Sequence, residues 1–207
     1  MCFAGNTDLG LSSYPFQNSK LFAITPPMMA RLSIGDIAPE ITLIDAMGTP
    51  LSLAQIRRQR RTLISFVRQF GCVFCRTELA RLARLRPQIE SLDAQLIVIT
   101  QSHNEETCAF CAEHAPGVDC YSDIAHGGGY RAFGLQRGHL SQLFGPAVWI
   151  QMVRTGATAG GKPVDDAALL PGIFVLNPDG RVHFAWYSRH IGDYPTNELL
   201  LDALRVP

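Results

Sequence analysis

Two nearly continuous apolar runs constrain the fold of this chain more than any other feature. "TLISFV" covers residues 62–67 and "AQLIVIT" covers residues 94–100. Runs of this length, rich in strand-forming residues, are typical of strands that are buried on both faces, as in parallel sheets. Between them, leucine and isoleucine recur at the helical spacing of positions 79, 82, 85, 89 and 92. The order predicts a βαβ unit, in which two parallel strands are joined by a crossover helix.

Further along the chain, turn-forming residues separate short runs of strand-forming residues. Hairpins are predicted for residues 41–53, with a turn at "GTP", and for residues 172–186, with a turn at "NPDG". "VDCYSD", residues 118–123, predicts one more strand. "PTNELLLDAL", residues 195–204, predicts a closing amphipathic helix.

Two local signals concern the predicted helices. Pro87 lies in the helix between the apolar runs and is expected to kink or split it. Ser102 and Glu105 predict a capping box at the start of the next helix. Residues 136–170 are rich in glycine, and their sequence predicts no clear helix or strand.

Taken in order, these elements predict the α/β class. The expected architecture is a thioredoxin-like sandwich, a central mixed β-sheet flanked by helices, formed by residues 34–207. Residues 1–33 are dominated by polar and turn-forming residues and predict a poorly ordered N-terminal extension. No second domain or internal repeat is expected.

Composition bears on the partners of the chain. Eighteen basic residues balance eighteen acidic ones, which gives no support for nucleic acid or an anionic membrane surface as a partner. No apolar run approaches the ~18 residues that a membrane span requires. The first twenty residues lack the early positive charge and compact apolar segment of an export signal. We therefore expect a cytoplasmic protein.

Cys72 and Cys75 form a CxxC pair where the first apolar run gives way to the predicted helix. Unpaired amides and the dipole at a helix start stabilise an anion, so the pKa of Cys72 is expected to fall. Cys75, one turn later, could close a disulfide with little backbone movement. Arg68 and Arg76 flank the pair and are expected to support the thiolate. A CxxC between strand and helix is typical of redox chemistry, although two thiols could also simply fill space in the core.

Several segments, in their order, resemble the peroxiredoxin-like branch of the thioredoxin superfamily, the alkyl hydroperoxide reductase and thiol-specific antioxidant family. They are "GDIAPEITLIDAMGTPLSL", "GCVFCRTELA", "VDCYSD" and "GIFVLNPDGRV". The closing "YSRHIGDYPTNELL" is similar to the tail of the CxxC-bearing peroxiredoxin-like-2 subgroup. His190 and Asp193 match that tail, and we expect a local turn or cap role for them. The resemblance implies thiol-dependent reduction of peroxides or disulfides.

The chain departs from the P-x-x-x-T-x-x-C motif that is typical of peroxiredoxins. Laid on "RQFGCVFC", the proline falls on Arg68, the threonine on Cys72 and the peroxidatic cysteine on Cys75. A thiol thus replaces the hydroxyl that would hold a peroxide, which favours a dithiol–disulfide cycle. In that cycle Cys72 attacks and Cys75 resolves, whereas on the peroxidatic alignment Cys75 attacks.

Pro171 precedes the first strand of the second hairpin. In the thioredoxin fold a cis proline lies before this strand and faces the CxxC. We therefore expect Pro171 to lie near Cys72, and its peptide bond with Leu170 is a candidate for the cis form.

Cys108 and Cys111 form a second CxxC pair, on the helix predicted after the second apolar run. Three interpretations stay open: a second redox pair or resolving partner for the first pair, a structural zinc site with Cys72 and Cys75, or helix packing. Zinc sites of four cysteines usually have about 15–20 residues between the pairs, and here the pairs lie further apart. Cys120, in a predicted strand, is assigned to the core.

The sequence therefore predicts an enzyme. In this hypothesis Cys72 and Cys75 cycle between dithiol and disulfide to reduce peroxides or disulfides, and thioredoxin, glutaredoxin or glutathione restores the dithiol. No organic cofactor or metal is expected. The alternative is a non-catalytic thioredoxin-fold module, whose cysteines sense redox state or bind zinc.

Overall fold

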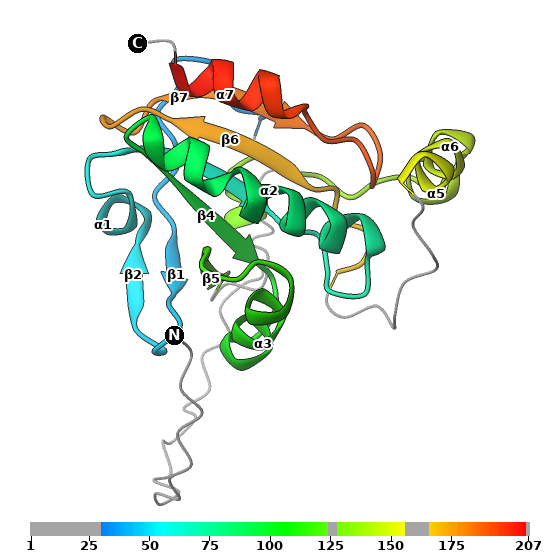
Figure 1. Cartoon of the computed structure of the whole chain (residues 1–207), viewed down its shortest axis with the longest axis horizontal. Helices are drawn as coiled ribbons and strands as arrows, with labels where there is room; N and C mark the ends of the chain where they lie inside the picture. Colours follow the sequence, from blue (N-terminus) through cyan, green and yellow to red (C-terminus); the bar gives the residue numbers. More distant parts are fainter. Residues whose placement is uncertain (1–29, 124–127, 156–165, 206–207) are drawn as a thin grey trace, which may run out of the picture.

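The computed structural model describes residues 30–123, 128–155 and 166–205 (Figure 1). The N-terminal extension expected at residues 1–33 thus lies almost entirely outside the described residues. Residues 30–33 are described and lie against the domain. The backbone N–H of Leu32 donates to the hydroxyl of Tyr187 at 2.6 Å, and the Arg31 guanidinium lies 4.9 Å from the centre of the same ring.

A seven-stranded mixed sheet forms the centre of the molecule, in the order β2-β1-β5-β4-β3-β6-β7. The strands are β1 (Thr42–Ile44), β2 (Pro50–Ser52), β3 (Arg61–Phe66), β4 (Ala94–Thr100), β5 (Asp119–Asp123), β6 (Gly172–Leu176) and β7 (Val182–Tyr187). Strands β3, β4 and β5 are parallel neighbours, and the other pairings are antiparallel. The predicted βαβ unit, both hairpins and the thioredoxin-like α/β class are confirmed.

Helices cover both faces of this sheet. They are α1 (Leu53–Arg57), α2 (Val73–Ser91), α3 (Asn104–His114), α4 (Gly128–Ala132), α5 (Leu140–Phe144), α6 (Pro146–Thr155) and α7 (Asn197–Arg205). In Figure 1, α2 crosses in front of β4, with α7 beside it. None of the helices in the described ranges is long and apolar enough to cross a membrane.

Neighbouring residues of the central strands point to opposite faces, as a strand requires. On β3, Leu63 packs with side chains of α2 and α7, whereas Ile64 and Phe66 pack with side chains of α1 and α4. This burial on both faces explains why the two central strands carry apolar or small uncharged side chains at nearly every buried position. A third cluster lies at the carboxyl end of the sheet and contains Cys72 and Cys75.

Two local predictions concern helices α2 and α3. Of the two effects expected at Pro87, a split is wrong, because α2 continues to Ser91, and a kink stays a prediction. The predicted capping box of Ser102 and Glu105 is wrong, because α3 begins one residue later, with His103 as its N-cap. Ser102 is instead buried, and its carbonyl accepts a hydrogen bond from the hydroxyl of Ser122, on the neighbouring strand β5.

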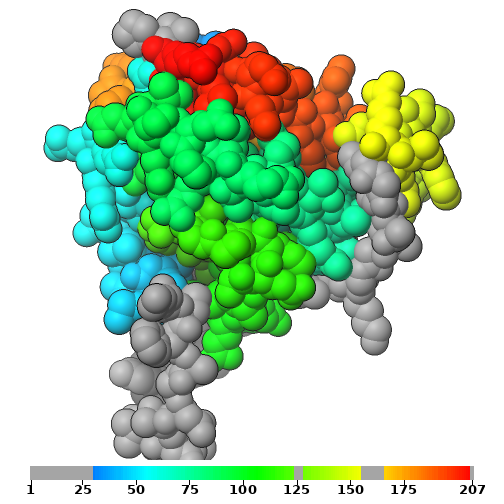
Figure 2. Space-filling view, viewed as in Figure 1, coloured from blue at the N-terminus to red at the C-terminus, as the bar shows by residue number. Residues whose placement is uncertain are grey.

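The segment that the sequence left unassigned contains helices α5 and α6. These two helices protrude from the sandwich at one side (Figure 2). Phe144 and Trp149 are exposed on them. Helices α2 and α3 lie next to each other on the face seen in the same view.

Tyr130 joins the ends of the two central strands just before the CxxC loop begins. Its ring is fully buried, and its hydroxyl lies 2.6 Å from the carbonyl oxygen of Val67 and 2.8 Å from that of Ile99. The hydroxyl therefore contributes to the position of the loop that follows β3.

Replacing Tyr130 with Phe should lower the free energy of unfolding by about 1–2 kcal/mol, because two buried carbonyls lose the one hydroxyl proton that they share. Urea denaturation measures this loss. The control is Tyr121→Phe, the same change at a partly exposed tyrosine of β5. A loss at Tyr130 no larger than at Tyr121 would contradict this role of the hydroxyl.

Candidate active site

The CxxC lies at the junction of β3 and α2, as predicted. Cys72 is the N-cap of α2 and has extended backbone angles, with φ −81° and ψ 116°. Its backbone N–H donates to the carbonyl of Gln69 at 3.3 Å, which closes the loop tightly against the helix start. Cys75 lies in the first helical turn. Both thiols are buried, with 5% of Cys72 and 1% of Cys75 exposed.

Cys72 is the more acidic thiol of the pair. Its pKa is lowered to about 6, chiefly by a hydrogen bond from the thiol of Cys75. The positive charge of Arg68 and the backbone N–H of Cys75 lower this pKa further, whereas burial opposes the shift. At neutral pH the sulfur of Cys72 is therefore mainly a thiolate.

Cys75 shifts in the opposite direction. Burial raises its pKa well above the ordinary value, and the hydrogen bond that it donates to Cys72 raises it further. The two thiols therefore share one proton at neutral pH, and that proton lies on Cys75. This division matches the order expected for a helix start, where the first cysteine meets the unpaired amides.

The two arginines that flank the pair have different environments. Arg68 is buried, and its carbonyl accepts a hydrogen bond from the side-chain amide of Gln101 at 2.5 Å. Its Nε has no hydrogen-bond partner among the described residues. Arg76 instead donates from Nε to the carbonyl of Phe70 at 3.0 Å, so it braces the loop. Of the two, only Arg68 is found to lower the pKa of Cys72.

Tyr194 is a site residue that sequence reasoning missed. Its hydroxyl donates to Sγ of Cys75 at 3.9 Å, across a sequence separation of 119 residues. Burial raises the pKa of Tyr194 well above its ordinary value, as do the nearby sulfurs. The tyrosine therefore stays protonated and acts as a donor to the second thiol. The resemblance of the tail drew attention to His190 and Asp193 but gave no signal for the neighbouring tyrosine.

The tail turn holds Tyr194 in place. The carbonyl of Asp193 accepts hydrogen bonds from Nε1 of Trp186 at 3.1 Å and from the hydroxyl of Ser188 at 2.7 Å. Its carboxylate accepts from the backbone N–H of Arg189 at 2.8 Å. Nδ1 of His190 accepts from a backbone N–H two residues later, at 3.3 Å. The local turn role predicted for His190 and Asp193 is therefore confirmed.

Glu78 is a second buried group that the sequence did not single out. It lies one turn after Cys75, and burial raises the pKa of its carboxyl, although hydrogen bonds from Arg81 offset part of this effect. Nε of Arg81 donates to the carboxylate at 2.7 Å. A hollow of about 280 Å³ is lined by these two side chains together with Phe74 and Tyr194. Phe74, which lies between the two cysteines, therefore borders an opening that is also lined by Asn197 and Glu198 at the start of α7.

The expectation of a cis bond at Pro171 is wrong. No peptide bond of the described residues is cis, so Leu170–Pro171 is trans. Trans is the ordinary form of an X–Pro bond. Just before this bond, the N–H of Leu170 donates to the carbonyl of Gln136 at 3.0 Å. Leu170 packs in the same hydrophobic cluster as Cys72 and Cys75. The proximity of Pro171 itself to Cys72 stays a prediction.

The second CxxC does not form a pair of its own. Cys111 is joined by a disulfide to Cys120, on β5, and Cys108 is outside that bond. Cys120, which was assigned to the core, is partly buried and packs against a core cluster, and its sulfur is also bonded to a cysteine of α3. No group of three or more metal-ligating side chains occurs within the described ranges. The arrangement contradicts a zinc site shared by the two CxxC pairs.

The acidity of Cys72 can be tested with two substitutions that leave its sulfur in place. Replacing Cys75 with Ala removes the largest contribution to the low pKa, and Arg68→Met removes the nearest positive charge. The ultraviolet absorbance of the thiolate should rise through a midpoint of about 6 in the parent and at higher pH in both variants. Cys72→Ser is the control and should lack this transition. Unchanged midpoints in both variants would contradict the assigned causes.

Tyr194→Phe removes the donor to Cys75 and keeps the ring. The thiolate of Cys75 loses about 1 kcal/mol of stabilisation, so the step in which Cys75 resolves a mixed disulfide should slow about 5-fold. The first attack by Cys72 should keep its rate. Rapid quenching with mass spectrometry measures both steps. Equal slowing of the two steps would point to a general loss of structure instead.

Comparison with known proteins assigns this arrangement to a family. The sequence pattern of the AhpC/TSA family matches residues 34–185. Peroxiredoxin-like 2C from Bos taurus is 27% identical over 177 residues, which cover 78% of this chain and 75% of the relative.

Solved structures share the fold. Peroxidoxin BcpB from Mycobacterium tuberculosis superposes with a TM-score of 0.63 at 20% identity, over 84% of this chain and 97% of the other. Peroxiredoxin Q from Xanthomonas campestris gives a TM-score of 0.59 at 20% identity, over 85% and 96%. The chain therefore belongs to the AhpC/TSA family, a family of thiol-dependent peroxidases and oxidoreductases with the thioredoxin fold.

Proposed function

We propose that this chain reduces peroxides or disulfides by cycling Cys72 and Cys75 between dithiol and disulfide. One observation carries the proposal: within a buried CxxC at a helix start, the pKa of the first thiol is lowered and that of the second is raised. The pair thus holds a nucleophile and a protonated partner in contact. Membership of the AhpC/TSA family supports thiol-dependent chemistry of this kind.

With a disulfide substrate, the thiolate of Cys72 attacks one sulfur, and the other sulfur leaves as a thiolate. Cys75 then loses its proton and attacks Sγ of Cys72, which releases the second half of the substrate. With a peroxide, the thiolate of Cys72 attacks one oxygen, the O–O bond breaks, and Cys72 becomes a sulfenic acid. The alkoxide or hydroxide that leaves takes up a proton from water and becomes an alcohol or water. Cys75 then loses its proton and attacks the oxidised sulfur, and the hydroxide that leaves takes up that proton as water. Either route ends in a Cys72–Cys75 disulfide, which thioredoxin, glutaredoxin or glutathione would reduce.

Arg68 is proposed to act on the substrate as well as on the thiolate. Its buried guanidinium lies close enough to lower the pKa of Cys72, and its Nε–H has no hydrogen-bond partner among the described residues. An N–H donor of this kind suits an oxygen or sulfur that gains negative charge as it leaves. The position where a typical peroxiredoxin has proline would thus supply a charge in this chain.

The alternative, in which Cys75 attacks, is less favoured by the electrostatics. A thiol with a raised pKa is a small fraction thiolate at neutral pH, and 1% of Cys75 is exposed. Cys75 is better suited to the resolving step, in which it loses its proton, since the hydroxyl of Tyr194 donates a hydrogen bond to its sulfur and stabilises the thiolate that forms. The proposed order is therefore attack by Cys72 and resolution by Cys75.

The reduced protein can be tested against a panel of hydrogen peroxide, an alkyl hydroperoxide and a small disulfide, with thioredoxin as recycling reductant. Cys72→Ser should lower turnover more than about 1000-fold, because it removes the nucleophile. Cys75→Ser should trap a mixed disulfide or sulfenic acid on Cys72, which mass spectrometry locates. If oxidation in Cys72→Ser occurs at Cys75 with the rate of the parent, the order of attack is reversed. If neither variant changes consumption of any substrate, the CxxC is not the reactive centre.

A further inference from the structure

The Cys111–Cys120 disulfide lies in the wall of a pocket that is separate from the hollow beside the CxxC. The pocket has a volume of about 530 Å³ and lies between α3, β5 and the β1–β2 turn. Cys108 lines it together with both cysteines of the disulfide. Three of the six cysteines of the chain therefore meet at one cavity.

The third cysteine lies next to the disulfide. Cys108 and Cys111 are three residues apart on α3, so their side chains project from the same face of the helix. Cys111 is buried, with 5% exposed, whereas Cys108 and Cys120 are partly exposed. Sγ of Cys108 lies 3.8 Å from the carbonyl oxygen of Ala46, in the β1–β2 turn that borders the pocket. The thiol of Cys108 therefore lines the same pocket as the bond between the other two sulfurs.

We propose that Cys108, Cys111 and Cys120 form a second thiol–disulfide exchange centre, in which an external thiol reduces the Cys111–Cys120 disulfide through Cys108. First, the thiolate of Cys108 attacks Sγ of Cys111, a Cys108–Cys111 bond forms, and Cys120 leaves as a thiolate. This step moves the disulfide to the pocket face of α3 without net oxidation or reduction.

The external thiol then completes the reduction. Its thiolate attacks Sγ of Cys108, the sulfur of Cys111 leaves, and a mixed disulfide with Cys108 results. A second molecule of the thiol attacks the mixed disulfide and releases Cys108. Two external thiols are thereby oxidised to one disulfide, and their two protons pass to Cys111 and Cys120. The two electrons that they lose break the original disulfide.

The lining of the pocket indicates the class of thiol. Arg58 brings a positive charge and Asp45 and Asp119 bring negative charges, all around the ring of Tyr121, whose pKa they affect. A cavity of this size admits a small molecule. A small peptide-like thiol, which carries both carboxylates and an ammonium group, complements this mixture of charges better than a neutral thiol does.

A general property of disulfides bears on this centre. Disulfides are uncommon in reducing compartments, and those that occur there are usually transient and catalytic or redox-sensing. A disulfide in a pocket wall with a third thiol beside it fits that use. A purely structural disulfide would need neither the pocket nor Cys108.

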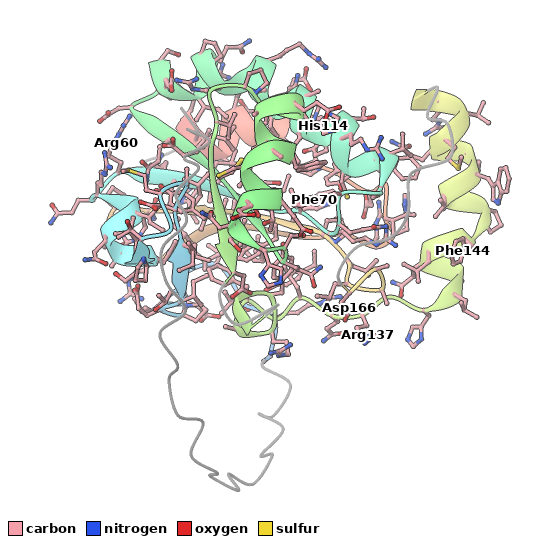
Figure 3. The ribbon with its side chains drawn as sticks, turned by 90° about the horizontal axis from the view of Figure 1, so that it is seen from below. Arg60, Phe70, His114, Arg137, Phe144 and Asp166 are labelled. Carbon is pink, nitrogen blue, oxygen red and sulfur yellow. A yellow bond between two sulfur atoms is a disulfide. The ribbon has the colours of Figure 1, made fainter. Side chains whose placement is uncertain are left out.

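The test has to separate this centre from the CxxC. The two are in contact, because Phe110, between Cys108 and Cys111, stacks on Phe70 of the CxxC loop with ring centres 4.1 Å apart. Figure 3 shows Phe70 beside α3. The full chain is therefore studied with Cys2, Cys72 and Cys75 replaced by Ser, so that the outcome is independent of the proposed function. Cys108, Cys111 and Cys120 are then the remaining thiols.

The oxidised form of this chain is mixed with excess reduced glutathione as the probe, quenched by acid, alkylated and mapped by mass spectrometry. We expect a transient Cys108–Cys111 disulfide and glutathione bound to Cys108. Adding Cys108→Ser or Cys108→Ala should slow loss of the Cys111–Cys120 disulfide at least about 10-fold, as expected when an adjacent thiol is removed. Both variants are made so that the rate of disulfide loss can still be measured in one of them if the other does not fold. Unchanged rates in both, or glutathione bound to Cys120 instead of Cys108, would overturn the proposal.

The thiol class has its own test. Arg58→Gln should slow reduction by glutathione about 3-fold or more and leave reduction by 2-mercaptoethanol unchanged, because only the first thiol carries carboxylates. Arg60→Gln is the matched control, an arginine of the same segment that does not line the pocket. Equal slowing with both thiols, or an equal effect of Arg60→Gln, would refute the charged-thiol assignment.

Discussion

The hydrogen bond between the two sulfurs of the CxxC is the interaction on which the candidate site depends. It places one proton on Cys75 and one negative charge on Cys72, in a region where water covers little of either thiol. A buried charge is costly unless other groups compensate for it. The start of α2, the guanidinium of Arg68 and the backbone N–H of Cys75 provide that compensation. The fold therefore builds a nucleophile by spreading one charge over several donors.

The far end of the chain supports the second thiol. The turn around Asp193 is held by Trp186 and Ser188 of the β7 segment, and it brings Tyr194 to Cys75. Cys72 and Cys75 thus receive their hydrogen bonds and charges from different parts of the structure. The loop after β3 stabilises the anion at Cys72, and the tail supplies a donor to Cys75. In this arrangement the hairpin that precedes the tail contributes to the chemistry as well as to the sheet.

Helix α3 links this site to the second group of cysteines. One face of the helix contributes Phe110 and Cys111 to the cluster that contains Cys72, and the disulfide of Cys111 ties the helix to β5. The stacked rings of Phe70 and Phe110 make the contact direct. Opening the Cys111–Cys120 disulfide would remove the covalent bond between β5 and a helix that packs on the CxxC loop. The oxidation state of this disulfide would therefore bear on the packing around the CxxC.

The features that depend on neighbouring residues could be predicted from the amino-acid sequence alone. The apolar runs before and after α2 specify strands buried on both faces, and the strand–CxxC–helix order places Cys72 at a helix start, where its pKa falls. The contacts that these residues make with distant segments of the chain became visible in the folded structure. Tyr194 and Cys75 are 119 residues apart, and nothing in the local pattern of either indicates the other. The pairing of Cys111 with Cys120 instead of Cys108 depends on how α3 packs on β5. The isomer of the Leu170–Pro171 bond was likewise open in the sequence, and the structure has it trans. Helices and strands follow from the periodicity and composition of short segments. Contacts between distant segments depend on how those helices and strands pack, and no short segment of the sequence specifies that packing.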